Sequence, residues 1–78
     1  MQEDLPEIEV RVPIKLGQFV KLASFVGTGG EAREVIQAGY VFVNGEPVSE
    51  RGRQLYGGDV VEFDDGEYVL AVRVAERS

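Results

Sequence analysis

The sequence contains no cysteine and no histidine among its 78 residues. Disulfide bonds are therefore excluded, and the common soft metal ligands and the usual general base of enzymes are missing. The chain also has no apolar run of about 18 residues, the length that a membrane-spanning helix requires. Its first ten residues are acidic and lack the basic-then-apolar layout of a secretion signal. These absences favour a small cytoplasmic protein without a catalytic site, a metal, a cofactor or a membrane partner.

Basic residues are also outnumbered by acidic ones, and the formal net charge is −6 at pH 7. Taken alone, this charge argues against a nucleic-acid partner. The charges are unevenly distributed, however: residues 11–56 carry six basic and four acidic side chains, whereas both ends of the chain are strongly acidic. A local basic face acts within a Debye length of about 8 Å, so the middle of the chain keeps nucleic-acid binding open. The alternative is an ordinary surface of mixed charge.

The clearest local signals begin at Thr28. Thr28 and Glu31 have the spacing of a capping box, in which two side chains satisfy backbone N–H groups at a helix start. Apolar or small residues then recur at helical spacing as far as Gly39, where a left-handed glycine would end the helix. This segment therefore predicts a short capped helix with one apolar face.

A strand and a hairpin turn are predicted directly after this helix. Residues 40–43 form an aromatic and β-branched run, and Asn44-Gly45 is a strong signal for a tight hairpin turn. The return strand is expected to be short and to lie at a sheet edge, because Pro47 has no N–H to donate.

The remaining segments complete an α+β pattern. Apolar residues alternate over residues 8–12, and again over residues 60–63 and 68–74, which predicts strands. Helical spacing of apolar residues predicts another helix over roughly Lys15–Ser24. We expect a single domain over residues 1–78, with a core over about residues 8–74. Its two helices would form a corner packed on a small, mostly antiparallel sheet of four to five short strands.

Two segments carry groups that suit phosphate binding. Gly29 and Gly30 would leave backbone N–H groups open at the positive end of a helix, although they also suit a tight turn between helices. Arg51 and Arg53 flank a glycine on a predicted exposed loop, where forked guanidinium donors reach phosphates or simply keep the loop solvated.

Three aromatic residues have two interpretations. Tyr40, Phe42 and Tyr56 are either stacking platforms for unpaired bases or members of the core. The core interpretation is favoured, because so small a core needs large side chains.

Three groups of residues follow the pattern of one known family. They are Ile14-Lys15-Leu16-x-Gln18-Phe19-x-Lys21-Leu22-Ala23, then Gly29-Gly30-Glu31-Ala32-Arg33-x-x-Ile36-x-x-Gly39-x-Val41-x-Val43-Asn44-Gly45-Glu46, and Arg51-Gly52-Arg53-x-Leu55 followed by Gly58-Asp59. This pattern resembles the S-four-like RNA-binding domain and, within it, the short stand-alone bacterial proteins of the YbcJ/YaaA type. The resemblance covers about residues 8–63 with nearly every spacing kept.

The resemblance implies the α-helical corner of that family, its αL motif, and the binding of structured RNA, commonly ribosomal. In the family the polar sides of the two helices and the nearby loops form the RNA face. The corresponding residues here are Lys15, Gln18, Lys21, Thr28, Gly29, Gly30, Arg33, Arg51 and Arg53. We expect a monomer without catalytic activity that is associated with the ribosome. The alternative is a protein-interaction module of the same fold, with acidic ends that dock on ribosomal or other basic proteins.

Overall fold

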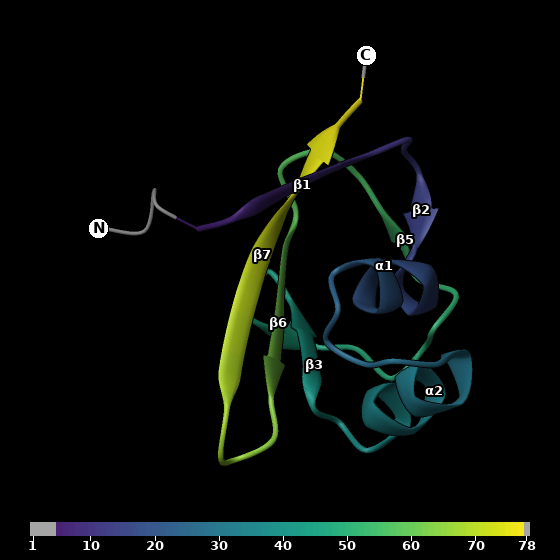
Figure 1. The fold of residues 1–78 in the computed structure, drawn as a ribbon, viewed down its shortest axis with the longest axis vertical. Coiled ribbons are helices and arrows are strands. Elements are labelled where there is room, and N and C mark those ends of the chain that lie inside the picture. The colour runs from purple at the N-terminus through teal and green to yellow at the C-terminus, as the bar shows by residue number, and fades with distance from the viewer. Residues whose placement is uncertain (1–4, 78) are drawn as a thin grey trace.

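The computed structural model describes residues 5–77, in which two helices lie against one face of a small sheet (Figure 1). No helix in this range is long and apolar enough to cross a lipid bilayer. The elements in chain order are β1 (Glu7–Val10), β2 (Ile14–Lys15), α1 (Leu16–Leu22), α2 (Gly29–Gln37), β3 (Val41–Val43), β4 (Glu46–Pro47), β5 (Gln54–Leu55), β6 (Val60–Asp64) and β7 (Val69–Glu76).

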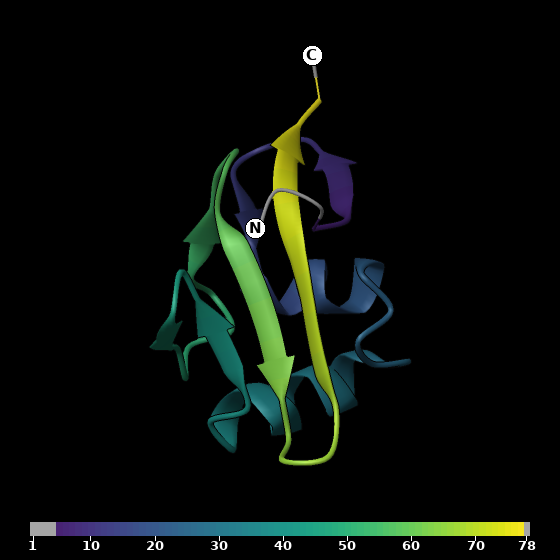
Figure 2. The ribbon, with the colours of Figure 1, turned by 90° about the vertical axis from the view of Figure 1, so that its left-hand side faces the viewer.

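Five strands form the main sheet in the spatial order β1-β7-β6-β3-β4, which Figure 2 shows from the side that the helices do not cover. β1 runs parallel to β7, whereas the other three neighbouring pairs are antiparallel. β2 and β5 form a separate antiparallel pair next to α1. This arrangement confirms the predicted α+β fold, with a two-helix corner on a mostly antiparallel sheet.

α2 begins at a complete capping box, as the sequence predicts. The Thr28 hydroxyl accepts a hydrogen bond from the Glu31 backbone N–H at 3.1 Å, and the Glu31 carboxylate accepts one from the Thr28 N–H at 3.2 Å. The same carboxylate oxygen accepts a second bond from the Gly27 N–H at 2.8 Å. Beyond the helix, Gly39 has a φ of +86°, a left-handed conformation that glycine adopts without strain. Both predicted ends of this helix are confirmed.

α1 is shorter than the predicted helix over Lys15–Ser24. Ile14 and Lys15 have extended backbones because they pair with β5, so the helix begins only at Leu16. At the other end, Ser24 has a φ of +63°, through which a right-handed helix cannot continue. Apolar periodicity gave the correct buried face, but it contains no signal for a two-residue strand.

The turn between β3 and β4 is formed by Asn44-Gly45, as predicted. Their φ values of +52° and +87° are the two positive values of a type I′ turn. The Asn44 side chain also attaches the turn to the next strand, because its amide donates to Asp59 Oδ1 at 3.0 Å and its oxygen accepts from the Val60 N–H at 2.9 Å. Asparagine therefore meets two needs here, a left-handed backbone and a side chain with both a donor and an acceptor.

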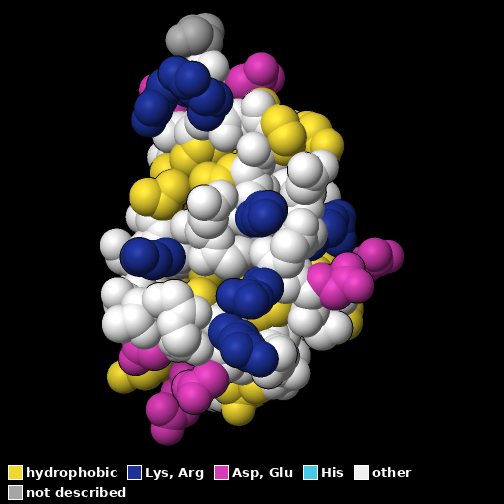
Figure 3. Space-filling view, turned by 90° about the vertical axis from the view of Figure 1, so that its right-hand side faces the viewer, with side chains coloured by type: hydrophobic (Ala, Val, Ile, Leu, Met, Phe, Trp, Pro, Cys, Tyr) yellow, Lys and Arg dark blue, Asp and Glu magenta, His cyan; other side chains and the backbone are white. Residues whose placement is uncertain are grey.

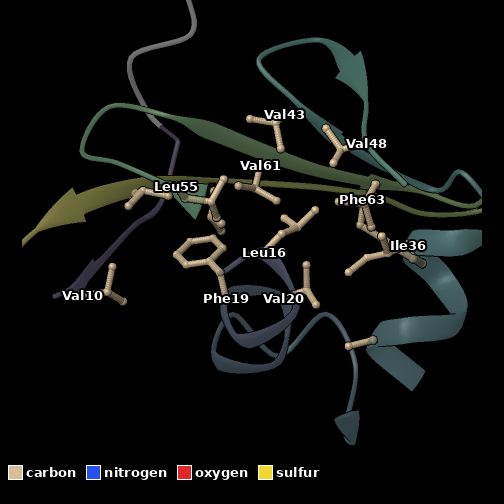
Figure 4. Packing of buried hydrophobic residues seen from close by; sticks show 14 residues of the cluster. Val10, Leu16, Phe19, Val20, Ile36, Val43, Val48, Leu55, Val61 and Phe63 are labelled. Carbon is tan, nitrogen blue, oxygen red and sulfur yellow. The ribbon is translucent and has the colours of Figure 1, made fainter. Parts of the chain in front are cut away.

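The core lies between the two helices and the main sheet and is entirely apolar (Figure 4). Leu16 and Phe19 of α1, Ile36 of α2, Leu55 of β5 and Val61 of β6 are fully buried in it. Burial of one such side chain contributes about 1.5–3 kcal/mol. No polar or charged side chain in residues 5–77 is buried. Every described charge therefore lies where a partner can reach it.

Of the three aromatic residues that the sequence predicts to be either stacking platforms or core members, two lie at the surface. Tyr40 is 40% exposed and Tyr56 is 52% exposed, whereas Phe42 is half-buried. The core interpretation is therefore wrong for both tyrosines. Tyr40 precedes β3 and Tyr56 follows β5, so each stands at a strand end.

Candidate nucleic-acid interface

The polar sides of the two helices and the loop of residues 51–53 meet around one open groove of about 450 Å³, which we call the cationic groove. Lys15 and Lys21 line it from the two ends of α1, Gly29 lines it from the start of α2, and Arg51 lines it from the loop. The remaining lining residues are Gly17, Gln18, Ala32 and Gly52. Figure 3 shows that Lys and Arg side chains gather on this side of the molecule.

The loop of residues 51–53 is joined to the start of α1 by backbone hydrogen bonds. The Leu16 N–H donates to the Arg53 carbonyl at 2.8 Å, and the Gly17 N–H donates to the Arg51 carbonyl at 2.9 Å. The first N–H groups of a helix have no partner within it, and Lys15 supplies no side-chain cap. The loop carbonyls therefore cap α1, and the same bonds hold the arginines beside Lys15.

Gly17 is a residue of this site that the sequence did not single out. A Cβ added at Gly17 would stand 3.3 Å from the Arg51 Cβ and 3.5 Å from the Arg51 carbonyl oxygen. A larger residue would therefore require Arg51 or the loop to shift by a few tenths of an ångström. A glycine inside a predicted helix costs about 1 kcal/mol relative to alanine, and that unfavourable choice was the available signal.

The start of α2 contributes backbone N–H groups to the edge of the groove. Within residues 5–77, no acceptor is recorded for the N–H groups of Gly29 and Gly30. A Cβ added at Gly29 would meet nothing within 4 Å, so the space beside its Cα is open. The Glu31 carboxylate stands at the same helix end and lowers its attraction for an anion. The contribution of this helix start is therefore smaller than the glycines alone suggest.

The cations of the predicted site are exposed and carry no ion pair in the described part of the chain. They are Lys15, Lys21, Arg33, Arg51 and Arg53. The single ion pair within residues 5–77 joins Arg73 to Glu7 at 3.7 Å, on β7 and β1. No described acidic side chain therefore competes with an anionic partner for a direct contact with these five groups.

The structure brings five of the nine predicted site residues into the groove lining and leaves four at its margins. Thr28 is used as the α2 cap, and Gly30 follows Gly29 on the exposed first turn. Arg33 stands one helical turn after Gly29, so it extends the same helix side. Arg53 contributes its carbonyl to the α1 cap, while its exposed side chain lies next to the groove residue Gly52.

Tyr56 adds an exposed aromatic ring near this loop. Its hydroxyl donates to the Gln54 side-chain oxygen at 3.1 Å, and its backbone N–H donates to Asp59 Oδ2 at 2.9 Å. Both bonds restrict the ring while more than half of the residue stays accessible. An accessible, positioned ring of this kind is suited to stacking on an unpaired base.

The helix corner, the mostly antiparallel sheet and the Asn44-Gly45 turn define the class of this protein, the small α+β domains of S4 type. The chain matches the model of the S4 domain over residues 7–71, and it belongs to that family. It is also 51% identical over 51 residues to a Bacillus subtilis (strain 168) protein described as "Probable ribosome maturation protein RlbA", an alignment that covers 65% of this chain and 72% of the relative. These findings confirm the predicted resemblance. The family match and this relative together suggest an RNA-binding or ribosome-related role.

Proposed function

We propose that this chain is a non-catalytic RNA-binding protein that holds phosphates of structured RNA, ribosomal RNA in particular, in the cationic groove. The observation that carries this proposal is the convergence of Lys15, Lys21 and Arg51 with the start of α2 on one exposed surface. Membership of the S4 domain family supports RNA as the ligand. The relative's printed role in ribosome maturation supports a ribosomal source.

The groove offers three kinds of donor to phosphate oxygens. Lysine ammonium groups act as point charges, arginine guanidinium groups give forked contacts, and the N–H groups of Gly29 and Gly30 give short backbone contacts. Arg33 and Arg53 extend the cationic surface at two margins of the groove. Contacts of this kind position a nucleic acid but do not read its sequence.

The rigidity of the groove favours a folded RNA over a flexible strand. Its walls are held in place by the capping box of α2 and by the backbone bonds between α1 and the loop. Donors at fixed spacing suit phosphates at fixed spacing, and proteins recognise folded RNA largely by its shape. Tyr56 would add one stacking contact to a base that is splayed out beside the loop.

Counterion release gives this proposal a measurable size. A plot of the logarithm of the binding constant against the logarithm of the salt concentration should be linear. For four to six phosphate contacts its slope should be roughly −3 to −5. The acidic ends of the chain oppose binding at longer range, and salt screens that repulsion as well.

The test is fluorescence anisotropy with a labelled, folded fragment of ribosomal RNA at about 50 and 200 mM salt. We expect saturable binding that weakens steeply at the higher salt. The double substitution Arg51→Ala with Arg53→Ala should cost about 1–3 kcal/mol of binding free energy, the range for hydrogen bonds to charged groups. Thermal unfolding should change little, because both arginine side chains are exposed.

The matched control is the double substitution Arg73→Ala with Arg77→Ala. It removes the same total charge from β7 and the chain end, where Arg73 pairs with Glu7 and Arg77 donates to the Glu9 carbonyl. We expect it to change the RNA affinity less than twofold. Equal losses in the two double variants would mean that net charge alone governs binding, which would remove the groove from the proposal.

A further inference from the structure

β7 is longer than the strand that covers its outer side. β6 pairs with residues 69–73 on one side of β7, whereas β1 pairs only with residues 73–76 on the other (Figure 2). The Arg73 N–H points to the β1 side, because it donates to the Pro6 carbonyl at 2.8 Å. Backbone direction alternates along a strand, so Val69 and Ala71 direct their N–H and C=O groups to that side too. Within residues 5–77, no strand pairs with them there.

The side chains along this open edge are apolar and accessible. Tyr68, Val69 and Leu70 are 66%, 61% and 45% exposed, whereas Val72 and Val74 further along the strand are buried. Proteins normally protect a strand edge with charges, proline or a covering segment. An edge that is both open and apolar is therefore a template for another strand.

A second groove lies against the same end of the sheet. Phe25 and Val26 line it from the connection between the helices, Val35 from α2 and Phe63 from β6, and its volume is about 560 Å³. The rings of Phe25 and Phe63 lie 6.1 Å apart. Leu70 is the cross-strand partner of Phe63, so the apolar surface continues from this groove to the open edge of β7.

The charged side chains that line the second groove are acidic, although Arg33 on α2 and Arg73 on β7 stand nearby. Glu31 and Glu34 line the second groove, and no lysine or arginine does. The hairpin turn that leads into β7 adds Asp64, Asp65 and Glu67. A partner that brings positive charge is therefore favoured. A second copy of this chain would place these acids against its own acidic groups and is disfavoured.

We propose that the open edge of β7 and the adjoining groove bind an extended, basic segment of another protein. The segment would add a strand beside Val69 and Ala71 and place an apolar side chain against Leu70 and Phe63. Its lysines or arginines would face Glu31, Glu34 and the hairpin acids. Main-chain bonds of the added strand supply affinity, and the pocket supplies selectivity.

This docking surface shares no lining residue with the cationic groove. The open edge is seen from the side shown in Figure 2, and the gathered cations from the opposite side in Figure 3. The open edge of β7 and the cationic groove can therefore be occupied at once. The chain would then join an RNA to a basic protein, a role that goes beyond RNA binding and does not depend on it.

The experiment is a titration of the full-length, nitrogen-15-labelled protein with a decapeptide of alternating lysine and valine, followed by two-dimensional NMR. A decapeptide of alternating glutamate and valine is the control ligand. With the lysine peptide we expect saturable shifts at the amides of residues 69–72 and 23–28. We also expect the amides of Val69 and Ala71 to exchange rapidly with solvent in the free protein and to become protected in the complex.

The variant Leu70→Lys should weaken binding of the lysine peptide at least tenfold, because it places a positive charge in the docking surface. Leu22→Lys is the matched control, since Leu22 is an exposed leucine of α1 that lines neither groove. Its affinity for the peptide should stay within twofold of the original. The NMR spectrum itself reports whether each variant is folded.

Four results would overturn the proposal. They are an absence of saturable binding at millimolar peptide, equal binding of the glutamate peptide, protection of Val69 and Ala71 in the free monomer, and shifts at these amides that depend only on protein concentration. Protection in the free monomer would mean that another part of the same chain pairs with the edge. Dependence on protein concentration would mean that a second copy pairs with it. RNA affinity of Leu70→Lys is measured in parallel, and we expect no change in it.

Discussion

The helix corner and the free end of the β6–β7 hairpin present their surfaces in opposite ways. In the corner, caps satisfy the N–H groups of Leu16, Gly17 and Glu31, and charged side chains remain available. At the hairpin end, the described chain leaves part of a strand edge open and exposes apolar side chains beside carboxylates. The first surface suits a polyanion, and the second suits a basic polypeptide. The net charge of −6 describes neither surface, because the cations are concentrated around one groove and acids line the other.

Among single substitutions in the helix corner, the largest effect is expected at Gly17, which has no side chain. Gly17→Val should force Arg51 and the loop of residues 51–53 to shift, because even a Cβ would stand 3.3 Å from the Arg51 Cβ, a contact that already requires a movement of a few tenths of an ångström. We expect RNA affinity to fall about tenfold, or about 1.4 kcal/mol, in the anisotropy assay. Peptide docking at β7 should be unaffected, which would separate the two surfaces.

Ala38→Val is the control for this prediction, since Ala38 is exposed and lines neither groove. Its RNA affinity should match that of the original chain. If Gly17→Val binds RNA equally well while remaining folded by its thermal transition, close contact between the loop and α1 is not required.

A smaller effect is expected at the cap of α2. Thr28→Ala removes the acceptor for the Glu31 N–H and should lower the free energy of unfolding by about 1 kcal/mol, measured by urea denaturation. Thr28→Ser keeps a hydroxyl in place and should retain most of the stability. A loss of equal size in both variants would show that the threonine methyl group, and not the cap, is responsible.

The smallest effect is expected at the hairpin end, at Asp65. Hydrogen bonds at 2.9 Å from the backbone N–H groups of Tyr68 and Glu67 hold the pKa of the Asp65 carboxyl below its ordinary value. A carboxyl whose pKa is lowered in the folded state contributes stability above its ordinary pKa and loses it as the pH falls through the folded value. Asp65→Asn should therefore be slightly less stable than the original chain at pH 7.

The difference should shrink as the pH falls below about 4, the ordinary range for aspartate. Urea denaturation between pH 7 and pH 2.5 measures it. Glu67→Gln is the control, because the Glu67 side chain accepts no recorded hydrogen bond within residues 5–77. A difference for Asp65→Asn that stays constant with pH would mean that the charge of this carboxylate is not involved.

Local chemistry explains which features could be predicted from the sequence. The capping box of Thr28 and Glu31 and the Asn44-Gly45 turn both act between residues that are close in the chain. Apolar periodicity likewise predicts which side of α1 is buried, because Leu16 and Phe19 follow helical spacing. The fold class followed from the order of these elements, and the structure confirms it.

Long-range contacts explain what could not be predicted. The β2–β5 pair and the approach of Gly17 to Arg51 join segments that only the complete fold brings together. The exposure of Tyr56 depends on where β5 ends relative to the helices, which no local pattern encodes. Among the predicted site residues, positions on the helices could be placed by spacing, but their grouping with Arg51 in one groove required the structure.

The bonds from Leu16 and Gly17 to the loop carbonyls have a consequence for folding kinetics. In the chain, α2, β3 and β4 lie between the two donors and the loop that accepts from them. These bonds therefore form only after the intervening segment has become compact. An isolated fragment that ends at β4 would contain both helices but would lack the arginines beside them.

A partner bound in the cationic groove would also select the folded chain. At a free concentration one hundred times its dissociation constant, it would stabilise that chain by about 2.7 kcal/mol.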